Sequence, residues 1–197
     1  MLDGLTSQEI IGAIAFLIRS IAGIIYIVSI LKGQTKPHFF TWLVFTILTV
    51  IAYLAQVSDN AGPGSWMMGV TALSCLINTF LAIPYGEREI TRGDKWALAT
   101  SLFAMAPWLL THDPLGSVIL VSLIDAVAMF PTLRKSWMKP YEENLTFHGM
   151  ATFNVFLSLF ALTHISLTTI LYPLAILLVN MALIVLCLVR RSTLKRP

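Results

Sequence analysis

Two opposite charges, Arg19 and Asp125, lie inside long apolar runs of the chain. A charge at the centre of a membrane helix costs roughly 2.5 to 3.5 kcal/mol on insertion scales, so each needs compensation. Each lies about ten residues from the outer start of its run, which at 1.5 Å per residue places both about 15 Å deep. We expect them to meet there, with Asp125 binding a solute or a proton at an affinity set by Arg19. The alternative is a static ion pair that fixes packing.

Two amides, Asn78 and Asn180, also share a depth, about 12 and about 13 residues from the outer ends of their runs. An amide supplies both a donor and an acceptor, which suits the hydroxyl or amide groups of a small polar solute. We therefore expect both to contact a solute, together with Asp125. Hydrogen bonding between neighbouring helices is the alternative, because Asn commonly does this in membranes.

Further polar side chains recur at helical spacing on two other apolar runs. They are Thr46, Thr49, Tyr53 and Gln56 on the first, and Thr152, Asn154 and Ser158 on the second. This spacing predicts that they line the same cavity as the two amides. Serine and threonine side chains also bond the backbone of their own helix, which leaves a purely local role open.

Motifs for covalent, metal or cofactor chemistry are absent from the sequence. There is no H-E-x-x-H, no G-x-S-x-G and no glycine-rich phosphate loop. Cys75 and Cys187 each lie in an apolar run, where free cysteine behaves as a small hydrophobic residue. The sequence thus predicts no enzyme activity, no metal and no cofactor. Its basic residues are dispersed in short loops, so a nucleic-acid partner is not expected.

The composition of the chain indicates whether these residues lie in a soluble domain or in a membrane. The chain has 197 residues, of which 57% are hydrophobic and 12% charged, and its mean hydropathy is +0.81. These values exclude a soluble globular domain. Spans of about 20 residues predict an all-α, polytopic membrane protein with seven transmembrane helices. The predicted spans are Ile10–Leu31, Phe39–Gln56, Trp66–Ile83, Trp96–Thr111, Leu115–Phe130, Phe147–Leu162 and Leu167–Val189.

The basic residues predict the orientation, because cytoplasmic loops are enriched in lysine and arginine. All of them except Arg19 fall in the loops after the first, third and fifth spans and in the tail: Lys32, Lys36, Arg88, Arg92, Lys95, Arg134, Lys135, Lys139, Arg190, Arg191, Lys195 and Arg196. We therefore expect a multi-pass protein of the cell (inner) membrane with its N-terminus outside and its C-terminus inside.

An internal repeat is indicated at an offset of 103 residues. This offset places Lys32-x-x-x-Lys36-Pro37 on Lys135-x-x-x-Lys139-Pro140. Two three-helix units in the same orientation need one inverting helix between them, so the sequence predicts a 3+1+3 plan with parallel repeats. The predicted parts are a first three-helix bundle (1–90), a linker helix (91–112) and a second three-helix bundle with a basic tail (113–197).

This plan, with an Asn deep in the third helix of each repeat, resembles the PQ-loop and SWEET-like transporter superfamily. In SWEETs such an Asn pair is part of the sugar site, which implies a binding role for Asn78 and Asn180. Pro131-Thr132 also lies where that superfamily has Pro-Gln or Pro-Thr. Lys36-Pro37-His38, with Thr41-Trp42, is similar to segments of bacterial seven-helix membrane proteins of no assigned activity.

The resemblance implies an integral membrane transporter or facilitator of a small polar solute. Access would alternate through a central site between the two bundles. The expected partners are the solute and the lipid bilayer, and a homo-oligomer is compatible with the sequence. The alternative is a non-transporting membrane receptor or a structural subunit on the same scaffold, and an intramembrane enzyme is less favoured because the sequence offers no nucleophile and base at suitable spacing.

Overall fold

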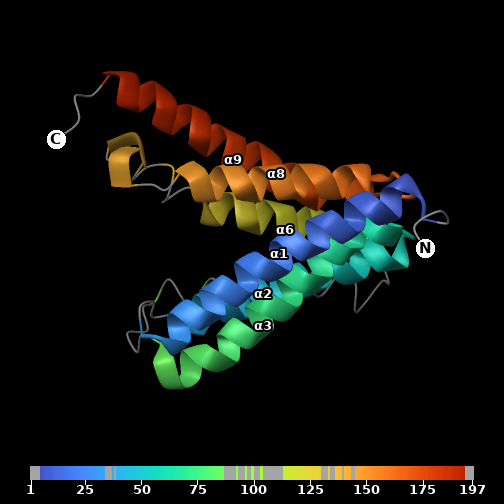
Figure 1. Ribbon diagram of the computed structural model, residues 1–197, viewed down its shortest axis with the longest axis horizontal. Coiled ribbons are helices and arrows are strands. Elements are labelled where there is room, and N and C mark those ends of the chain that lie inside the picture. The colour runs from blue at the N-terminus through green and yellow to red at the C-terminus, as the bar shows by residue number, and fades with distance from the viewer. Residues whose placement is uncertain are drawn as a thin grey trace.

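The part of the chain that the computed structural model describes is helical. It comprises residues 5–33, 37, 39–86, 92, 96, 99, 103, 113–129, 133, 136–138, 140–142 and 145–193. Its α-helices are α1 (Ser7–Leu31), α2 (Phe39–Ser58), α3 (Trp66–Tyr85), α6 (Pro114–Ala128), α8 (Leu145–Phe160) and α9 (Leu167–Thr193), with short 3-10 turns η1 (Gly62–Ser65) and η2 (Pro140–Glu142). Six of the predicted apolar runs are thus helices (Figure 1). The predicted fourth helix, Trp96–Thr111, lies outside the described residues except for three isolated positions.

Four of the described helical segments are long and apolar enough to cross a membrane, which indicates a membrane-embedded protein. They are Ser7–Leu31, Phe39–Ser58, Gly62–Tyr85 and Leu167–Thr193. Large apolar side chains cover the outside of these helices: on α1, Ile24 and Ile25 are 60% and 65% exposed. A surface of this kind is stable against lipid and not against water.

Local capping explains where the helices begin. The hydroxyl of Thr6 accepts a hydrogen bond from the backbone N–H of Glu9, whose carboxylate accepts from the backbone N–H of Thr6. This capping box starts α1 three residues before the predicted Ile10. Ser166 caps α9, because its hydroxyl accepts from the backbone N–H of Thr169 at 3.2 Å.

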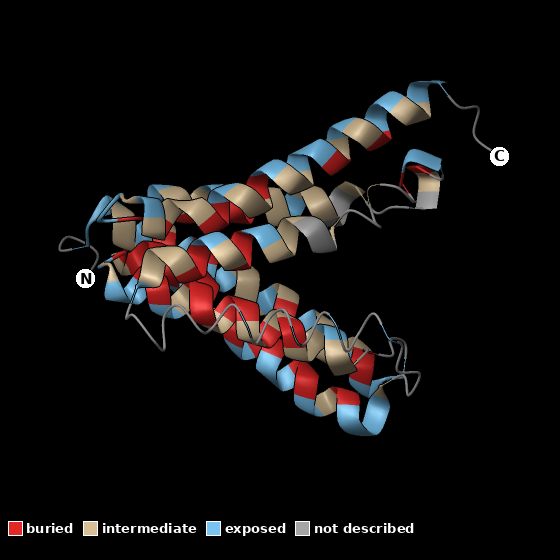
Figure 2. Ribbon diagram, turned by 180° about the vertical axis from the view of Figure 1, so that it is seen from behind, coloured by how far each residue is buried: buried red, intermediate tan, exposed pale blue. Residues whose placement is uncertain are grey.

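The helices pack as two groups of three, which we call the first triple (α1, α2 and α3) and the second triple (α6, α8 and α9). In the first triple, α3 packs against both α1 and α2, and in the second, α9 packs against both α6 and α8. Between the triples, α1 packs on α8 and α2 packs on α6. Buried residues concentrate where these helices meet, as Figure 2 shows. The core includes Ala15, Leu48, Ile51, Met68, Val118, Val121 and Tyr172.

The two triples meet at one end of the molecule and diverge at the other. They are in contact at the end that carries the N-terminus and the connections that lead into α3 and α9 (Figure 1). Toward the end that carries the C-terminus, α9 and α3 separate widely. If the N-terminus is external, as the basic residues predict, the closed end is the outer one.

Candidate functional site

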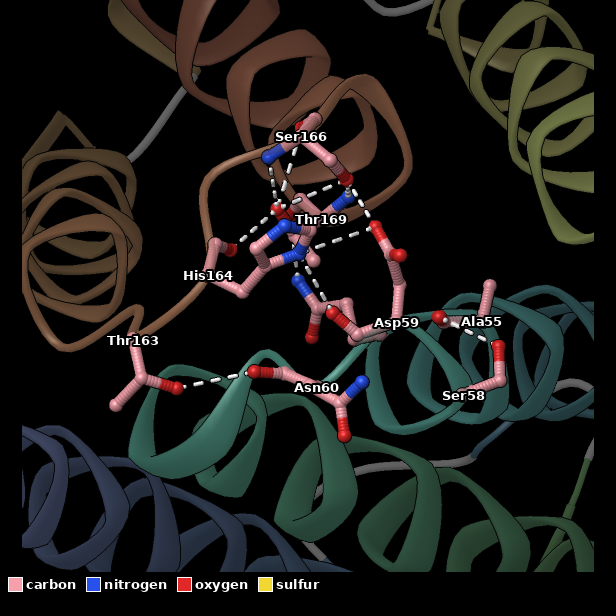
Figure 3. A network of polar contacts seen from close by, with 9 residues as sticks. Ala55, Ser58, Asp59, Asn60, Thr163, His164, Ser166 and Thr169 are labelled. Atoms are coloured by element: carbon pink, nitrogen blue, oxygen red, sulfur yellow. Dashed lines mark hydrogen bonds and ion pairs between the residues drawn. The ribbon is translucent and has the colours of Figure 1, made fainter.

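At the closed end, the connection that leads into η1 and α3 bonds to the connection that leads into α9. We call this contact the outer closure and define it by Gln56, Asp59 and Asn60 on the first triple and Thr163, His164, Ser166 and Thr169 on the second. The side chains of Asp59 and Ser166 point toward each other across the contact (Figure 3). Apart from Gln56, none of these residues stands out in the sequence as part of a site.

Asp59 is the acceptor at the centre of the outer closure. The hydroxyl of Ser166 donates a short hydrogen bond to the Asp59 carboxylate. The Nδ1 atom of His164 lies 3.0 Å from the backbone carbonyl oxygen of Asp59 and 3.7 Å from its Oδ2 atom. Asp59 therefore contacts two residues of the opposite triple, Ser166 through its carboxylate and His164 mainly through its backbone carbonyl.

Backbone groups join the outer closure as well. The backbone N–H of Thr163 donates to the carbonyl of Ala61 at 3.1 Å, and its hydroxyl donates to the carbonyl of Asn60 at 3.0 Å. The Gln56 amide donates from Nε2 to the carbonyl of Thr169 at 3.0 Å. These bonds use backbone acceptors that a buried connection must pair in any case.

Glycines allow the two connections to approach closely. A Cβ atom on Gly64 would lie 2.9 Å from the Cα atom of Leu162, which is closer than real side chains permit. Gly62 has a φ of +61°, a backbone conformation that favours glycine, and a Cβ atom there would overlap the Thr163 side chain. The two connections are therefore in close contact at the closed end.

The expected ion pair between Arg19 and Asp125 is not formed. Arg19 instead donates from Nε to the hydroxyl of Thr71 at 2.8 Å, so its side chain turns toward α3 of its own triple. Among the described residues, no ion pair or side-chain hydrogen bond involves the Asp125 carboxylate. The physical reason is helix packing: α1 packs on α3 and α8, whereas α6 packs on α2 and α9.

Arg19 and Asp125 each interact electrostatically with a buried side chain. Cys75 on α3 lies within electrostatic range of Arg19 and beside the hydroxyl of Thr49. Tyr172 on α9 lies within electrostatic range of both Cys75 and Asp125. We call Arg19, Thr49, Cys75, Asp125 and Tyr172 the central polar layer. Sequence analysis missed Tyr172, whose only signal was a polar tip within an apolar span next to Pro173.

Two of the predicted amides are buried without a partner for their oxygen. Asn78 is 2% exposed and Asn154 is 4% exposed, and the Oδ1 atom of each lacks a hydrogen bond in the part of the chain that the structure describes. The Oε1 atom of Gln56 is in the same condition. A buried unpaired oxygen is costly, which makes such atoms candidates for contact with a ligand or a water molecule.

Asn180 makes a different contact from the one that the sequence suggested. Its Oδ1 atom lies 2.8 Å from Nδ1 of His148, and its Nδ2 atom donates to the carbonyl of Ile176 at 2.9 Å. Both partners belong to the second triple, so the amide bonds between α8 and α9 of its own triple. Asn78 and Asn180 therefore differ: the first has an unpaired oxygen, and the second is paired.

The remaining predicted residues have local roles. The hydroxyls of Thr49 and Thr152 donate to the carbonyls of Phe45 and His148, four residues earlier on their own helices, at 2.6 and 2.8 Å. Thr49 still contributes to the central polar layer through Cys75. Tyr53 lines a different space, an apolar groove of about 800 Å³ between α1 and α3.

The residues of the central polar layer include groups that can bind a polar solute. Within the described ranges, no group of three His, Cys, Asp or Glu side chains is placed to hold a metal ion. The central polar layer offers one cation, one anion and hydroxyl groups, which can bind a polar solute without forming covalent bonds. Comparison of the chain with family models, with curated proteins and with solved structures finds no match.

Proposed function

We propose that the protein is a membrane transporter or facilitator of a small polar solute. The observation that carries this proposal is that the outer closure bonds the two triples at one end while the triples diverge at the other (Figure 1). Tyr172 of the central polar layer belongs to a buried core that contains residues of both triples, among them Leu48 and Val121. Alternating access requires a binding site between two helix bundles that rock about it. Contact of the two triples at one end and their divergence at the other support such a mechanism.

The packing supports the 3+1+3 plan as part of this proposal. Each helix pair of the first triple has a counterpart in the second, because α1 with α3 matches α6 with α9, and α2 with α3 matches α8 with α9. The contacts between triples are reciprocal: α1 packs on α8, and α6 packs on α2. Shifting α2 and α3 by 103 residues gives 142–161 and 169–188, close to α8 and α9. The linker at 91–112, which the sequence predicts to be the inverting helix, lies outside the described residues except for isolated positions.

The proposed orientation places the diverging end in the cytoplasm. At this end the Arg190 guanidinium lies 4.5 Å from the centre of the Trp137 ring, and its Nε donates to the Trp137 carbonyl at 3.0 Å. An arginine on an aromatic ring suits the headgroup level of a membrane. Thiols introduced at Asp113 and Arg92 test the orientation: we expect Asp113→Cys to react with an impermeant maleimide from outside and Arg92→Cys only in inverted vesicles. The reverse labelling pattern would reject the proposed orientation.

Flux through reconstituted vesicles tests transport itself. Proteoliposomes should take up at least one solute from a panel of labelled sugars, nucleosides, vitamins and amino acids faster than protein-free vesicles do. The absence of uptake for all four classes would favour a non-transporting receptor or subunit on the same scaffold.

A cross-link at the outer closure tests alternating access. Because Asp59 and His164 face each other, Asp59→Cys with His164→Cys should form a disulfide under mild oxidation. We expect oxidation to reduce uptake at least tenfold and a reductant to restore it. Each single variant is the matched control and should be insensitive to the oxidant. Full uptake by the cross-linked protein would mean that the outer closure does not open during transport.

A further inference from the structure

An apolar groove runs along the outside of α1 and α3. It holds about 800 Å³, and exposed apolar side chains form much of its walls, among them Ile24 on α1 and Leu73 and Ile77 on α3. The two helices approach each other closely beneath it, because a Cβ atom on Gly23 would lie only 2.8 Å from the Oγ atom of Ser74. The groove therefore opens on the lipid-facing side of the first triple.

The length of the groove matches one leaflet of a bilayer. Its lining residues run from Ala13 to Ile27 on α1 and from Trp66 to Ile77 on α3, and both helices begin at the closed end (Figure 1). At 1.5 Å per residue this is about 21 Å along α1 and about 16 Å along α3. The hydrocarbon core of a bilayer is about 30 Å thick, so one leaflet accounts for about 15 Å. The groove thus has the length of an acyl chain in the leaflet at the closed end, whereas a helix of another protein would cross both leaflets.

A polar pocket of about 560 Å³ adjoins the groove at the closed end. The two spaces share Tyr53 and Trp66 as lining residues. Residues of both triples line the pocket, including Glu9 and Asn60 of the first and Thr163 of the second. The Tyr53 hydroxyl, the Trp66 indole N–H and the Asn60 amide make no hydrogen bond to any described residue. An apolar groove that continues into a polar pocket with free donors suits a molecule with an apolar chain and a polar head.

The charge of the pocket selects the head. Glu9 is the only charged side chain among the described residues that line it. The carboxylate accepts from the backbone N–H and the hydroxyl of Thr6, and both bonds go to Oε2, so Oε1 is left for a further donor. An ammonium group can donate to this oxygen, and the rings of Tyr53 and Trp66 favour a cation beside them. A head without a cation would gain none of these contacts.

We propose that the groove and the pocket together bind one phospholipid with a primary ammonium head, phosphatidylethanolamine. One acyl chain lies in the groove between α1 and α3, and the other remains in the bilayer. The ammonium group donates to Oε1 of Glu9, and the phosphate accepts from the Asn60 amide and the Trp66 indole N–H. Because Thr163 belongs to the second triple, the bound head contacts both sides of the outer closure and strengthens it. This site is separate from the proposed solute path.

Native mass spectrometry of the purified full-length protein tests the site, because one spectrum counts both bound lipids and protein copies. The probes are palmitoyl-oleoyl phosphatidylethanolamine and the phosphatidylglycerol with the same chains, which lacks the ammonium group. We expect one phosphatidylethanolamine per chain, bound at least fivefold more tightly than phosphatidylglycerol. It should also raise the unfolding temperature, since it is a ligand of the folded state, whereas glycerophosphoethanolamine, a head without chains, should not at the same concentration.

Two variants separate the head from the chain. Glu9→Gln removes the charge and keeps the capping box, in which glutamine also serves, so the preference for phosphatidylethanolamine should fall to within twofold. Ser20→Phe fills the groove midway along α1 and should weaken both phospholipids at least fivefold. The matched controls are Asp113→Asn, which removes a charge at the start of α6, and Ile21→Phe, on an exposed side chain outside the groove lining. Both controls should bind as the wild type does.

Equal binding of the two phospholipids by the wild-type protein would overturn the inference, as would unchanged lipid binding by Ser20→Phe. Dimers that Ser20→Phe converts to monomers, without a change in lipid binding, would overturn it in favour of a second copy in the groove. If a variant fails to fold, the comparison of the three probes on the wild-type protein still decides. Failure of solute uptake would reject transport and leave this inference standing.

Discussion

The hydroxyl of Thr163 donates to the backbone carbonyl of Asn60, and these two residues are 103 positions apart in the chain. The same offset aligns the Lys-x-x-x-Lys-Pro segments at Lys32 and Lys135. If two repeats are related by a two-fold axis, a residue can touch its own counterpart only on that axis. The contact between Asn60 and Thr163 therefore marks where a pseudo-two-fold axis would leave the outer end of the molecule.

Enlarging Gly64 should open the outer closure. The Cβ atom of Gly64→Ala would lie 2.9 Å from the Leu162 Cα atom, so the two connections must separate. We expect a destabilisation of about 1 to 3 kcal/mol, measured by unfolding in denaturing detergent. Gly149→Ala on α8 is the matched control, because a Cβ atom there meets nothing within 4 Å. Equal effects of the two substitutions would contradict the close contact.

Removing the Ser166 hydroxyl should destabilise the start of α9 and the contact with Asp59 together. Ser166→Ala deletes an N-cap, which typically contributes about 1 kcal/mol, and a hydrogen bond to a carboxylate whose side chain is 32% exposed. We expect a loss of about 1 to 2 kcal/mol, the contact with Asp59 adding little because solvent screens it. Thr168→Ala, two residues along, should cost less than half as much in the same unfolding measurement. If Ser166→Ala left the free energy of unfolding unchanged, the outer closure would not depend on this side chain.

Arg19 and Asp125 should behave as independent sites in the absence of ligand. Because no ion pair joins them, the losses from Arg19→Met and Asp125→Leu should add to within about 0.5 kcal/mol in a double-mutant cycle. A cycle of Arg19→Met with Thr71→Val is the positive control and should show a coupling of about 0.5 to 2 kcal/mol, since these side chains share a hydrogen bond of 2.8 Å. Coupling between Arg19 and Asp125 above about 1 kcal/mol would restore the ion pair that the sequence suggested.

Asn78 and Asn180 should respond oppositely to truncation. Asn180→Ala breaks a hydrogen bond between α8 and α9, so it should lower stability by about 0.6 kcal/mol, the average for such bonds in membranes, and leave solute binding nearly unchanged. Asn78→Ala removes an oxygen that has no protein partner, so it should weaken solute binding by about 1 to 3 kcal/mol. Thermal unfolding with and without a bound solute measures both quantities. If Asn180→Ala alone abolished binding, the pairing with His148 would be irrelevant in the functional state.

The helices could be predicted from the sequence because the residue patterns that indicate them are local. Long apolar runs predicted the six described α-helices to within a few residues. The start of α1 was predicted too late, because the capping box of Thr6 and Glu9 lies outside the apolar run. Composition likewise sufficed to predict a membrane-embedded chain, since a hydrophobic excess of this size needs no knowledge of contacts.

The candidate site was only partly accessible. Sequence singled out Asn78, Asn154 and Asp125 because an amide or a carboxylate in an apolar run stands out by its type. Asn78 and Asn154 are buried in the structure, and the solute contact of all three residues stays a prediction. It wrongly paired Arg19 with Asp125, because equal depth says nothing about the direction of a side chain around the helix axis. The outer closure was missed, since Asp59, His164 and Ser166 are ordinary connecting residues until two distant segments are brought together.

The amino-acid sequence by itself determined that this protein forms apolar helices, several of them long enough to span a membrane, and, to within a few residues, where they begin and end. The tertiary structure decided which polar groups meet. In a soluble helix the apolar stripe reveals the face that turns inward, but lipid is as apolar as a protein core, so all faces of a membrane helix read alike. Only the packing of the six described helices therefore sets which polar groups meet. It brings Arg19 of α1 to Thr71, Asn180 of α9 to His148, and Asn60 to Thr163.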